Sequence, residues 1–240
     1  MIRYLLLDLD NTLYSDTRGM ERDILVRMNA FVADFLGMTV HEARERRHER
    51  VRGYGTTLEW LMAEEGLSDP EIYFAAIHPE GEEYCIEPDP DLAGLLDSIE
   101  LPKAVFTNSP HEHAKRVLGK LGVTDKFQAI YDIRFSRLKG KPDPDAFRRV
   151  CAACGVSVEE ALFVDDLPKY LRGFLDIGGN GLLLDEAGRH AETGMRRIHS
   201  LAELKDILAE ESAAERQLDL FGGPSGGPSG PSGGPSGPAD

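Results

Sequence analysis

The sequence predicts an α/β protein that has a Rossmann-like, doubly wound parallel sheet and a small inserted α-helical domain. Two observations support this prediction. Short apolar runs alternate with helical patterns along most of the chain, which is typical of a parallel sheet with covering helices. The stretch 15–88 differs, because it shows several helical patterns and no convincing strand.

The predicted strands are short apolar runs that end in polar or turn residues. They cover residues 4–7, 104–106, 129–131, 161–164 and 181–184. The predicted helices of the sheet domain mostly begin near Asp, Pro or Ser, and several stop at Gly. They cover residues 90–99, 111–122, 143–155, 168–179 and 200–218. Within the inserted stretch, helical patterns cover residues 20–37, 39–53 and 56–66.

These elements divide the chain into three parts. We expect a sheet domain made of residues 1–14 and 89–215, with residues 15–88 as the inserted helical domain. Residues 216–240 form a separate C-terminal part. Its stretch 222–240 repeats Gly, Pro and Ser and offers nothing that fills a core, so we expect a disordered tether there.

Composition excludes several classes of function. A net charge of −15 argues against broad binding to nucleic acid or to an anionic membrane surface. No apolar stretch approaches the ~20 residues of a transmembrane helix, and the start of the chain lacks the pattern of a secretory signal. The low, odd number of cysteines (Cys85, Cys151 and Cys154) fits a reducing compartment. We therefore expect a cytoplasmic protein that acts on a small molecule.

Polar side chains of chemical interest follow four of the predicted strands or the loops after them. They are Asp8 and Asp10, Thr107 and Asn108, Lys141, and Asp165 and Asp166. Parallel strands end at the same edge of a sheet, so these side chains should converge there. Each group alone could be a turn or a helix cap, but four groups at successive strand ends are hard to explain by local structure.

The chemistry of this set points to phosphate and a metal ion. Clustered carboxylates need a hard cation with oxygen ligands, and Mg²⁺ held by Asp8, Asp10, Asp165 and Asp166 would meet this need. Lys141 can donate to phosphate oxygens. An Asp carboxylate can also attack phosphorus and form an aspartyl-phosphate, while a second acid moves protons.

The motifs DLDNT, Thr107-Asn108, Lys141-Pro142 and FVDD (163–166) resemble, in order, the four motifs of the haloacid dehalogenase superfamily. The resemblance covers about residues 1–205, and it implies that the insertion is a helical cap of the C1 type. It also implies that Asp8 is the nucleophile and a Mg²⁺ ligand. The dehalogenases lack the second acid of the first motif, so the presence of Asp10 implies phosphoryl transfer.

The same resemblance assigns roles to the remaining positions. Asp10 is the general acid and base, and its backbone carbonyl binds the metal. Thr107 and Lys141 hold the phosphoryl group. Asp165 binds the metal directly, and Asp166 acts through water or by holding Lys141.

Finer features resemble the pyrimidine 5′-nucleotidase branch, which implies a nucleoside monophosphate such as UMP or CMP as substrate. They are Asn11 and the segments 54–62, 84–96 and 106–118. Tyr170 departs from the Asn of many relatives. Tyr54, His78, Asn108 and His113 are candidate substrate contacts, although the two histidines could equally be structural. A phosphatase for a sugar phosphate or phosphoglycolate, a mutase and a catalytically inactive binding protein are the alternatives.

A further motif stands next to the C-terminal repeat. The residues Gln217, Leu218, Asp219, Leu220 and Phe221 resemble the peptide by which bacterial proteins dock on the DNA sliding clamp. Leu220 and Phe221 would fill an apolar pocket while Gln217 forms hydrogen bonds at its rim. Alternatively, Leu218, Leu220 and Phe221 pack the last helix against the core.

Overall fold

The computed structural model describes residues 1–15 and 19–221, except for the side chains of residue 212 and of residues 214–221. The side chains of the clamp-like peptide 217–221 and the whole repeat 222–240 therefore lie outside the described part. Docking of this peptide on a sliding clamp stays a prediction from the sequence.

One parallel sheet organises the described residues. Its strand order is β3-β2-β1-β4-β5-β6, with β1 in the middle. The strands are β1 (Tyr4–Leu7), β2 (Lys103–Phe106), β3 (Ala129–Tyr131), β4 (Ala161–Asp165), β5 (Asn180–Leu184) and β6 (Arg197–Ile198). The chain leaves β1 towards β2 and β3 on one side and returns to β4 on the other. The predicted doubly wound α/β fold is thus confirmed, and the order reverses beside β1, where such folds bind ligands.

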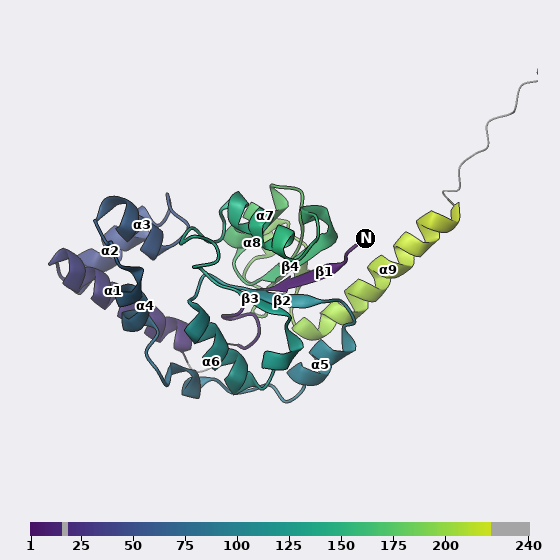
Figure 1. The fold of residues 1–240 in the computed structure, drawn as a ribbon, viewed down its shortest axis with the longest axis horizontal. Helices are drawn as coiled ribbons and strands as arrows, with labels where there is room; N and C mark the ends of the chain where they lie inside the picture. Colours follow the sequence, from purple (N-terminus) through teal and green to yellow (C-terminus); the bar gives the residue numbers. More distant parts are fainter. Residues whose placement is uncertain (16–18, 222–240) are drawn as a thin grey trace, which may run out of the picture.

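Helices cover both faces of the sheet (Figure 1). They are α5 (Leu92–Ser98), α6 (His111–Leu121), α7 (Pro144–Ala153), α8 (Pro168–Leu175) and α9 (Leu204–Phe221). Alternate side chains of β1 point to opposite faces. Leu5 and Leu7 lie in one core with α5 and α6, whereas Tyr4 and Leu6 lie in a second core with α7 and α8. Because both faces are covered, β1 is apolar throughout.

Four helices between β1 and β2 form a separate layer, here called the helical insertion. They are α1 (Met20–Leu36), α2 (Val40–Arg50), α3 (Thr57–Glu64) and α4 (Pro70–Ile77). They lie together at one end of the molecule (Figure 1). The insertion has its own apolar core, in which Trp60 and Leu61 are fully buried. The side chains of Thr39, Thr56 and Asp69 cap the start of α2, α3 and α4, respectively.

One α-helix, α4, and one strand, β6, are not predicted from the sequence. The start of α4 carries a helix-start signal, Asp69-Pro70. The residues that follow are apolar on nearly all sides of the helix, so the sequence shows no alternation of apolar and polar residues with a helical period. The strand β6 contains only two residues, Arg197 and Ile198, and pairs with β5. Short 3₁₀ helices complete the structure: η1 (Glu82–Cys85), η2 (Thr124–Lys126), η3 (Val158–Glu160), η4 (Ala191–Thr193) and η5 (Leu201–Glu203).

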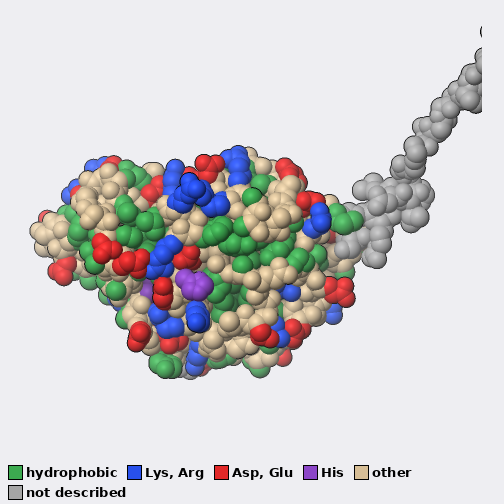
Figure 2. All heavy atoms as spheres, in the orientation of Figure 1, with side chains coloured by type: hydrophobic (Ala, Val, Ile, Leu, Met, Phe, Trp, Pro, Cys, Tyr) green, Lys and Arg blue, Asp and Glu red, His purple; other side chains and the backbone are tan. Residues whose placement is uncertain are grey.

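The helical insertion is tied to the sheet domain by charged contacts. Lys169, on α8, donates to the backbone carbonyls of Val51 and Tyr54 at 3.2 and 2.7 Å. Arg134, which follows β3, pairs with Glu71 of α4 at 2.6 Å. Figure 2 shows Lys and Arg side chains interspersed with acids along the junction between the two parts. These contacts place the insertion over the carboxyl edge of the sheet.

Within the described residues, no helix by itself has the length and apolar character needed to cross a membrane. The pair α1 and α2 passes that test only when joined, across a bend of 102°.

Candidate active site

A buried lysine joins two buried carboxylates at the centre of the sheet edge. Asp8 directly follows β1, and Asp165 is the last residue of the neighbouring strand β4. The Lys141 Nζ atom donates to Oδ1 of Asp8 at 2.6 Å and to Oδ2 of Asp165 at 2.7 Å. All three residues are buried. Burial of a charge is costly unless it is paired, so each acid requires the lysine and the lysine requires both acids.

Aromatic rings surround the same ammonium group. The Nζ atom of Lys141 lies 5.5 Å from the ring centre of Phe106 and 5.2 Å from those of Phe163 and Tyr170. Burial acts to lower the pKa of Lys141, but the charges of Asp165 and Asp8 outweigh this effect and leave the pKa above its ordinary value. The lysine therefore remains charged. Tyr170, which departs from the family pattern, forms one wall of its cage.

Three carboxylates at this point could hold a metal ion. The candidate ligand oxygens of Asp8, Asp165 and Asp166 lie within 4.8 Å of one another. Burial outweighs the opposing charge of Lys141 and raises the pKa of Asp8 to about 7. Burial, followed by the charges of Asp8 and Asp165, raises the pKa of Asp166 to about 8. Lys141 thus brings one positive charge to a cluster of three carboxylates. Hard oxygen donors with a deficit of positive charge fit Mg²⁺.

The residues that directly follow β2 hold the loop that carries Lys141. The side chain of Asn108 donates to the backbone carbonyl of Lys141 at 2.9 Å and accepts from its backbone N–H at 2.8 Å. Thr107 is buried, and its hydroxyl accepts from the backbone N–H of Ser109 at 3.0 Å. Asn108 thus positions the loop of the lysine, and the Thr107 hydroxyl keeps its own proton to donate.

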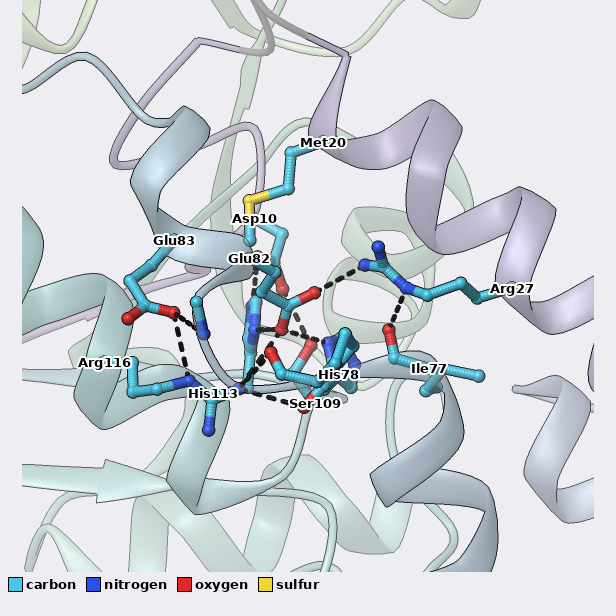
Figure 3. Close-up of polar contacts among 12 residues, drawn as sticks. Asp10, Met20, Arg27, Ile77, His78, Glu82, Glu83, Ser109, His113 and Arg116 are labelled. Atoms are coloured by element: carbon cyan, nitrogen blue, oxygen red, sulfur yellow. Dashed lines mark hydrogen bonds and ion pairs between the residues drawn. The ribbon is translucent and has the colours of Figure 1, made fainter.

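Asp10 lies in a hydrogen-bond network of its own (Figure 3), whereas Asp8 is held by Lys141. Its Oδ1 atom accepts from the Tyr14 hydroxyl at 2.7 Å and lies 2.8 Å from Nε2 of His113. Its Oδ2 atom accepts from the hydroxyl of Ser109 at 2.7 Å. Burial alone would raise the pKa of Asp10, but His113 outweighs burial and leaves the pKa well below its ordinary value. The pKa values of Asp8 and Asp10, the two acids of the first motif, are therefore shifted in opposite directions.

His113 is fully buried between two carboxylates. Its Nε2 atom faces Asp10, and its Nδ1 atom lies 2.6 Å from Oε1 of Glu82. Two acceptors on opposite sides of the ring require two N–H donors, so the ring is an imidazolium when both acids are ionised. Burial lowers the pKa of His113, but Asp10 and Glu82 outweigh it and raise the pKa to about 9.

A cavity of about 340 Å³ opens above these groups, between the sheet edge and the helical insertion. Its floor contains polar side chains from the strand ends. These are Asp8, Asp10, Thr107, Asn108, Lys141 and Asp166. Its opposite wall is largely apolar and comes from α1, α3 and α4. It includes Ile24, Leu25, Met28, Leu58, Tyr73 and Ile77. This volume is typical of a site for a small molecule.

Comparison with known proteins identifies the family. A model of the haloacid dehalogenase-like hydrolases matches residues 2–177 of the chain. The chain belongs to this family. Phosphate metabolism protein 8 of Saccharomyces cerevisiae is 27% identical to this hydrolase over 222 residues, which cover 84% of the chain and 69% of that protein.

Solved structures show the same fold at low sequence identity. A HAD phosphatase from Thermococcus onnurineus is 20% identical, with a TM-score of 0.62 over 86% of this chain and 98% of that chain. L-2-haloacid dehalogenase from Xanthobacter autotrophicus is 19% identical, with a TM-score of 0.56 over 87% of this chain and 99% of that chain. Because a phosphatase and a dehalogenase share the fold, the fold alone does not select the reaction.

The four candidate substrate contacts of this hydrolase differ in their position relative to the cavity. Asn108 and His78 line the cavity, and Nδ1 of His78 lies 3.0 Å from Glu82. His113 is buried behind Asp10. Tyr54 is not among the residues that line the cavity, and its hydroxyl donates to Glu64 at 2.8 Å. Of the four, only Asn108 and His78 line the cavity.

Sequence reasoning gave no role to Tyr14, Ser109 or Glu82, all of which belong to the network around Asp10. Tyr14 follows Asp10 by four residues, and Ser109 follows Thr107 at a strand end, so both were near identified motifs. Glu82 lies in an acidic stretch, EGEE, with no pattern that distinguishes it from a solvated acid.

Gly140 leaves no room for a side chain beside this site. A Cβ atom there would lie 2.0 Å from Oδ1 of Asn108 and 2.7 Å from Cδ1 of Ile133. Gly140→Ala should displace Asn108 from the Lys141 backbone, lower the free energy of unfolding by about 1–3 kcal/mol and slow hydrolysis by up to about 10²-fold. Denaturant unfolding and turnover would measure both. The control is Gly119→Ala, since a Cβ there meets nothing within 4 Å. Unchanged stability and turnover in Gly140→Ala would contradict this account.

Proposed function

We propose that this hydrolase is a Mg²⁺-dependent phosphomonoesterase that acts on nucleoside 5′-monophosphates such as UMP and CMP. The observation that supports the proposal is the arrangement on the cavity floor. There, Asp8 is held by Lys141 beside Asp165 and Asp166, and Asp10 lies in a separate hydrogen-bond network.

The first step is attack of the Asp8 carboxylate on phosphorus. One Asp8 oxygen accepts from Lys141, which orients the carboxylate while its other oxygen forms the new bond. The bond between phosphorus and the ester oxygen breaks, and the departing alcohol takes a proton from Asp10, to which the hydrogen-bonded His113 imidazolium can supply it. Lys141 and Thr107 donate to the phosphoryl oxygens, whose charge must be neutralised in the transition state.

The second step returns the enzyme to its starting state. Asp10, now ionised, takes a proton from water, and the water oxygen bonds to phosphorus of the aspartyl-phosphate. The bond between phosphorus and the Asp8 oxygen breaks, which releases inorganic phosphate and regenerates both acids. Mg²⁺ held by Asp8, Asp165 and Asp166 would supply further neutralisation of the phosphoryl charge.

Asp10 also favours phosphoryl transfer over dehalogenation. An ester oxygen leaves as an alcohol and benefits from a proton donor, whereas a halide leaves without one. The name of the yeast relative, phosphate metabolism protein 8, agrees with this choice.

The cavity wall favours a nucleotide over a sugar phosphate. Its apolar side chains on α1 and the rings of Tyr73 and Tyr170 suit the flat face of a base. A sugar phosphate or phosphoglycolate would leave much of this apolar wall in contact with hydroxyl groups, which prefer hydrogen-bond partners.

A panel of phosphate esters with purified protein and Mg²⁺ tests the proposal. We expect phosphate release from UMP and CMP with kcat/KM at least about tenfold above that for a hexose phosphate or phosphoglycolate, because binding of the base contributes about 1.4 kcal/mol or more. Chelation by EDTA should abolish release, and added Mg²⁺ should restore it. A higher kcat/KM for a sugar phosphate would refute the nucleotide assignment, and turnover that survives EDTA would refute the metal requirement.

A further inference from the structure

Glu82 is the centre of a buried polar network between the helical insertion and the sheet domain (Figure 3). It lies in η1, on the return from α4 to the sheet domain, and its side chain is only 3% exposed. Its Oε1 atom lies 2.6 Å from His113, 3.0 Å from His78 and 3.3 Å from Arg116, while Oε2 accepts from Arg27 at 2.5 Å. Four partners from three separate segments thus converge on one carboxylate.

This network does not have the chemistry of a metal site. The candidate ligand atoms of His78, Glu82 and His113 do lie within 4.8 Å of one another. However, Arg27 and Arg116 already neutralise the Glu82 carboxylate and would repel a cation. His113 also has both ring nitrogens engaged by carboxylates. The network is therefore complete without an ion.

His113 transmits the position of Glu82 to Asp10. Its ring is fully buried, and each ring nitrogen is bonded to one of the two acids. A ring held at both ends cannot turn without losing one of two charge-assisted hydrogen bonds. The orientation of the Asp10 carboxylate therefore depends on Glu82, and Glu82 in turn depends on Arg27 of α1.

We propose that His113 and Glu82 are positioning residues that set the orientation of Asp10 for proton transfer. This inference rests on the proposed function, because it assumes that Asp10 protonates a departing ester oxygen. Arg27 connects the pair to the helical insertion, so the insertion and the proton-transferring acid are aligned by the same buried carboxylate.

Proton transfer matters most when the leaving group is a strong base. Phenyl phosphate and p-nitrophenyl phosphate have nearly the same shape, but the nitro group makes the departing phenolate a much weaker base. Loss of Asp10 orientation should therefore slow the first ester more than the second. General damage to the fold would slow both equally, and the ratio of their kcat/KM values does not depend on the fraction of folded enzyme.

The test measures kcat/KM for both esters in His113→Ala, His113→Gln and Glu82→Gln. We expect His113→Ala to lose about 10–100-fold on phenyl phosphate and much less on p-nitrophenyl phosphate, so that the ratio of the two changes by about tenfold or more. His113→Gln keeps a donor near the position of Nε2 and should change the ratio less. Glu82→Gln should change it in the same direction as His113→Ala.

The control is Glu83→Gln, because Glu83 is the next residue and pairs with Arg116 at 3.2 Å, whereas the ring nitrogens of His113 bond to Glu82 and Asp10. In Glu83→Gln, the ratio of the kcat/KM values for the two esters should equal that of the wild type. An unchanged ratio in both His113→Ala and Glu82→Gln, with the wild type active, would overturn the inference and leave the proposed function in place. A wild type that hydrolyses no phosphate ester would overturn both.

Discussion

Asp8→Asn is expected to reduce phosphate release by roughly 10⁴-fold or more, as loss of a nucleophile does in other enzymes. An amide cannot form the aspartyl-phosphate, so the first step has no substitute group in the site. The fold should remain intact, because the Asn oxygen can still accept from Lys141 and the volume is unchanged. Initial rates of phosphate release, with the circular dichroism spectrum as a check of folding, would measure the effect.

The matched control is Asp125→Asn, which makes the same change on an exposed side chain paired with Lys126. It should retain wild-type activity, since surface substitutions of this kind have little effect. An Asp8→Asn variant with more than a small fraction of wild-type turnover would exclude Asp8 as the nucleophile.

Lys141→Met is expected to produce the second large effect, on both stability and turnover. The substitution leaves the Asp8 and Asp165 carboxylates buried without the cation that joins them. Removal of one partner from a buried ion pair typically costs about 3–5 kcal/mol, and we expect a loss of this size in the free energy of unfolding. Turnover should fall by about 10²-fold or more, because a charge on the phosphoryl group also loses its partner.

Two further measurements give this prediction its specificity. Adding Asp165→Asn to Lys141→Met should restore part of the lost stability, because it removes one uncompensated buried charge. Lys139→Met is the control, since Lys139 is exposed and pairs with Asp143 at 2.8 Å. A Lys141→Met variant as stable as Lys139→Met would show that the buried pairs contribute nothing to the fold.

The sequence by itself determined the sheet and the polar edge of the site. Apolar runs with polar ends are local patterns, and parallel strands must end at the same edge, so Asp8 and Asp165 could be placed near each other although 156 residues separate them. The helices α1, α2 and α3 between the first two strands could be predicted for the same reason, because helical periodicity is local. The short strand β6 could not, since a two-residue element has no period.

Only the tertiary structure decided the surroundings of Asp10. Glu82 and His113 are 31 residues apart, and His113 is 103 residues from Asp10. The sequence near His113 and near Glu82 does not indicate the hydrogen-bond partners of these residues. Their hydrogen bonds form only when η1, α6 and the end of β1 pack together. Local patterns thus specify which side chains reach the sheet edge, and long-range packing determines which of them are held, neutralised and oriented there.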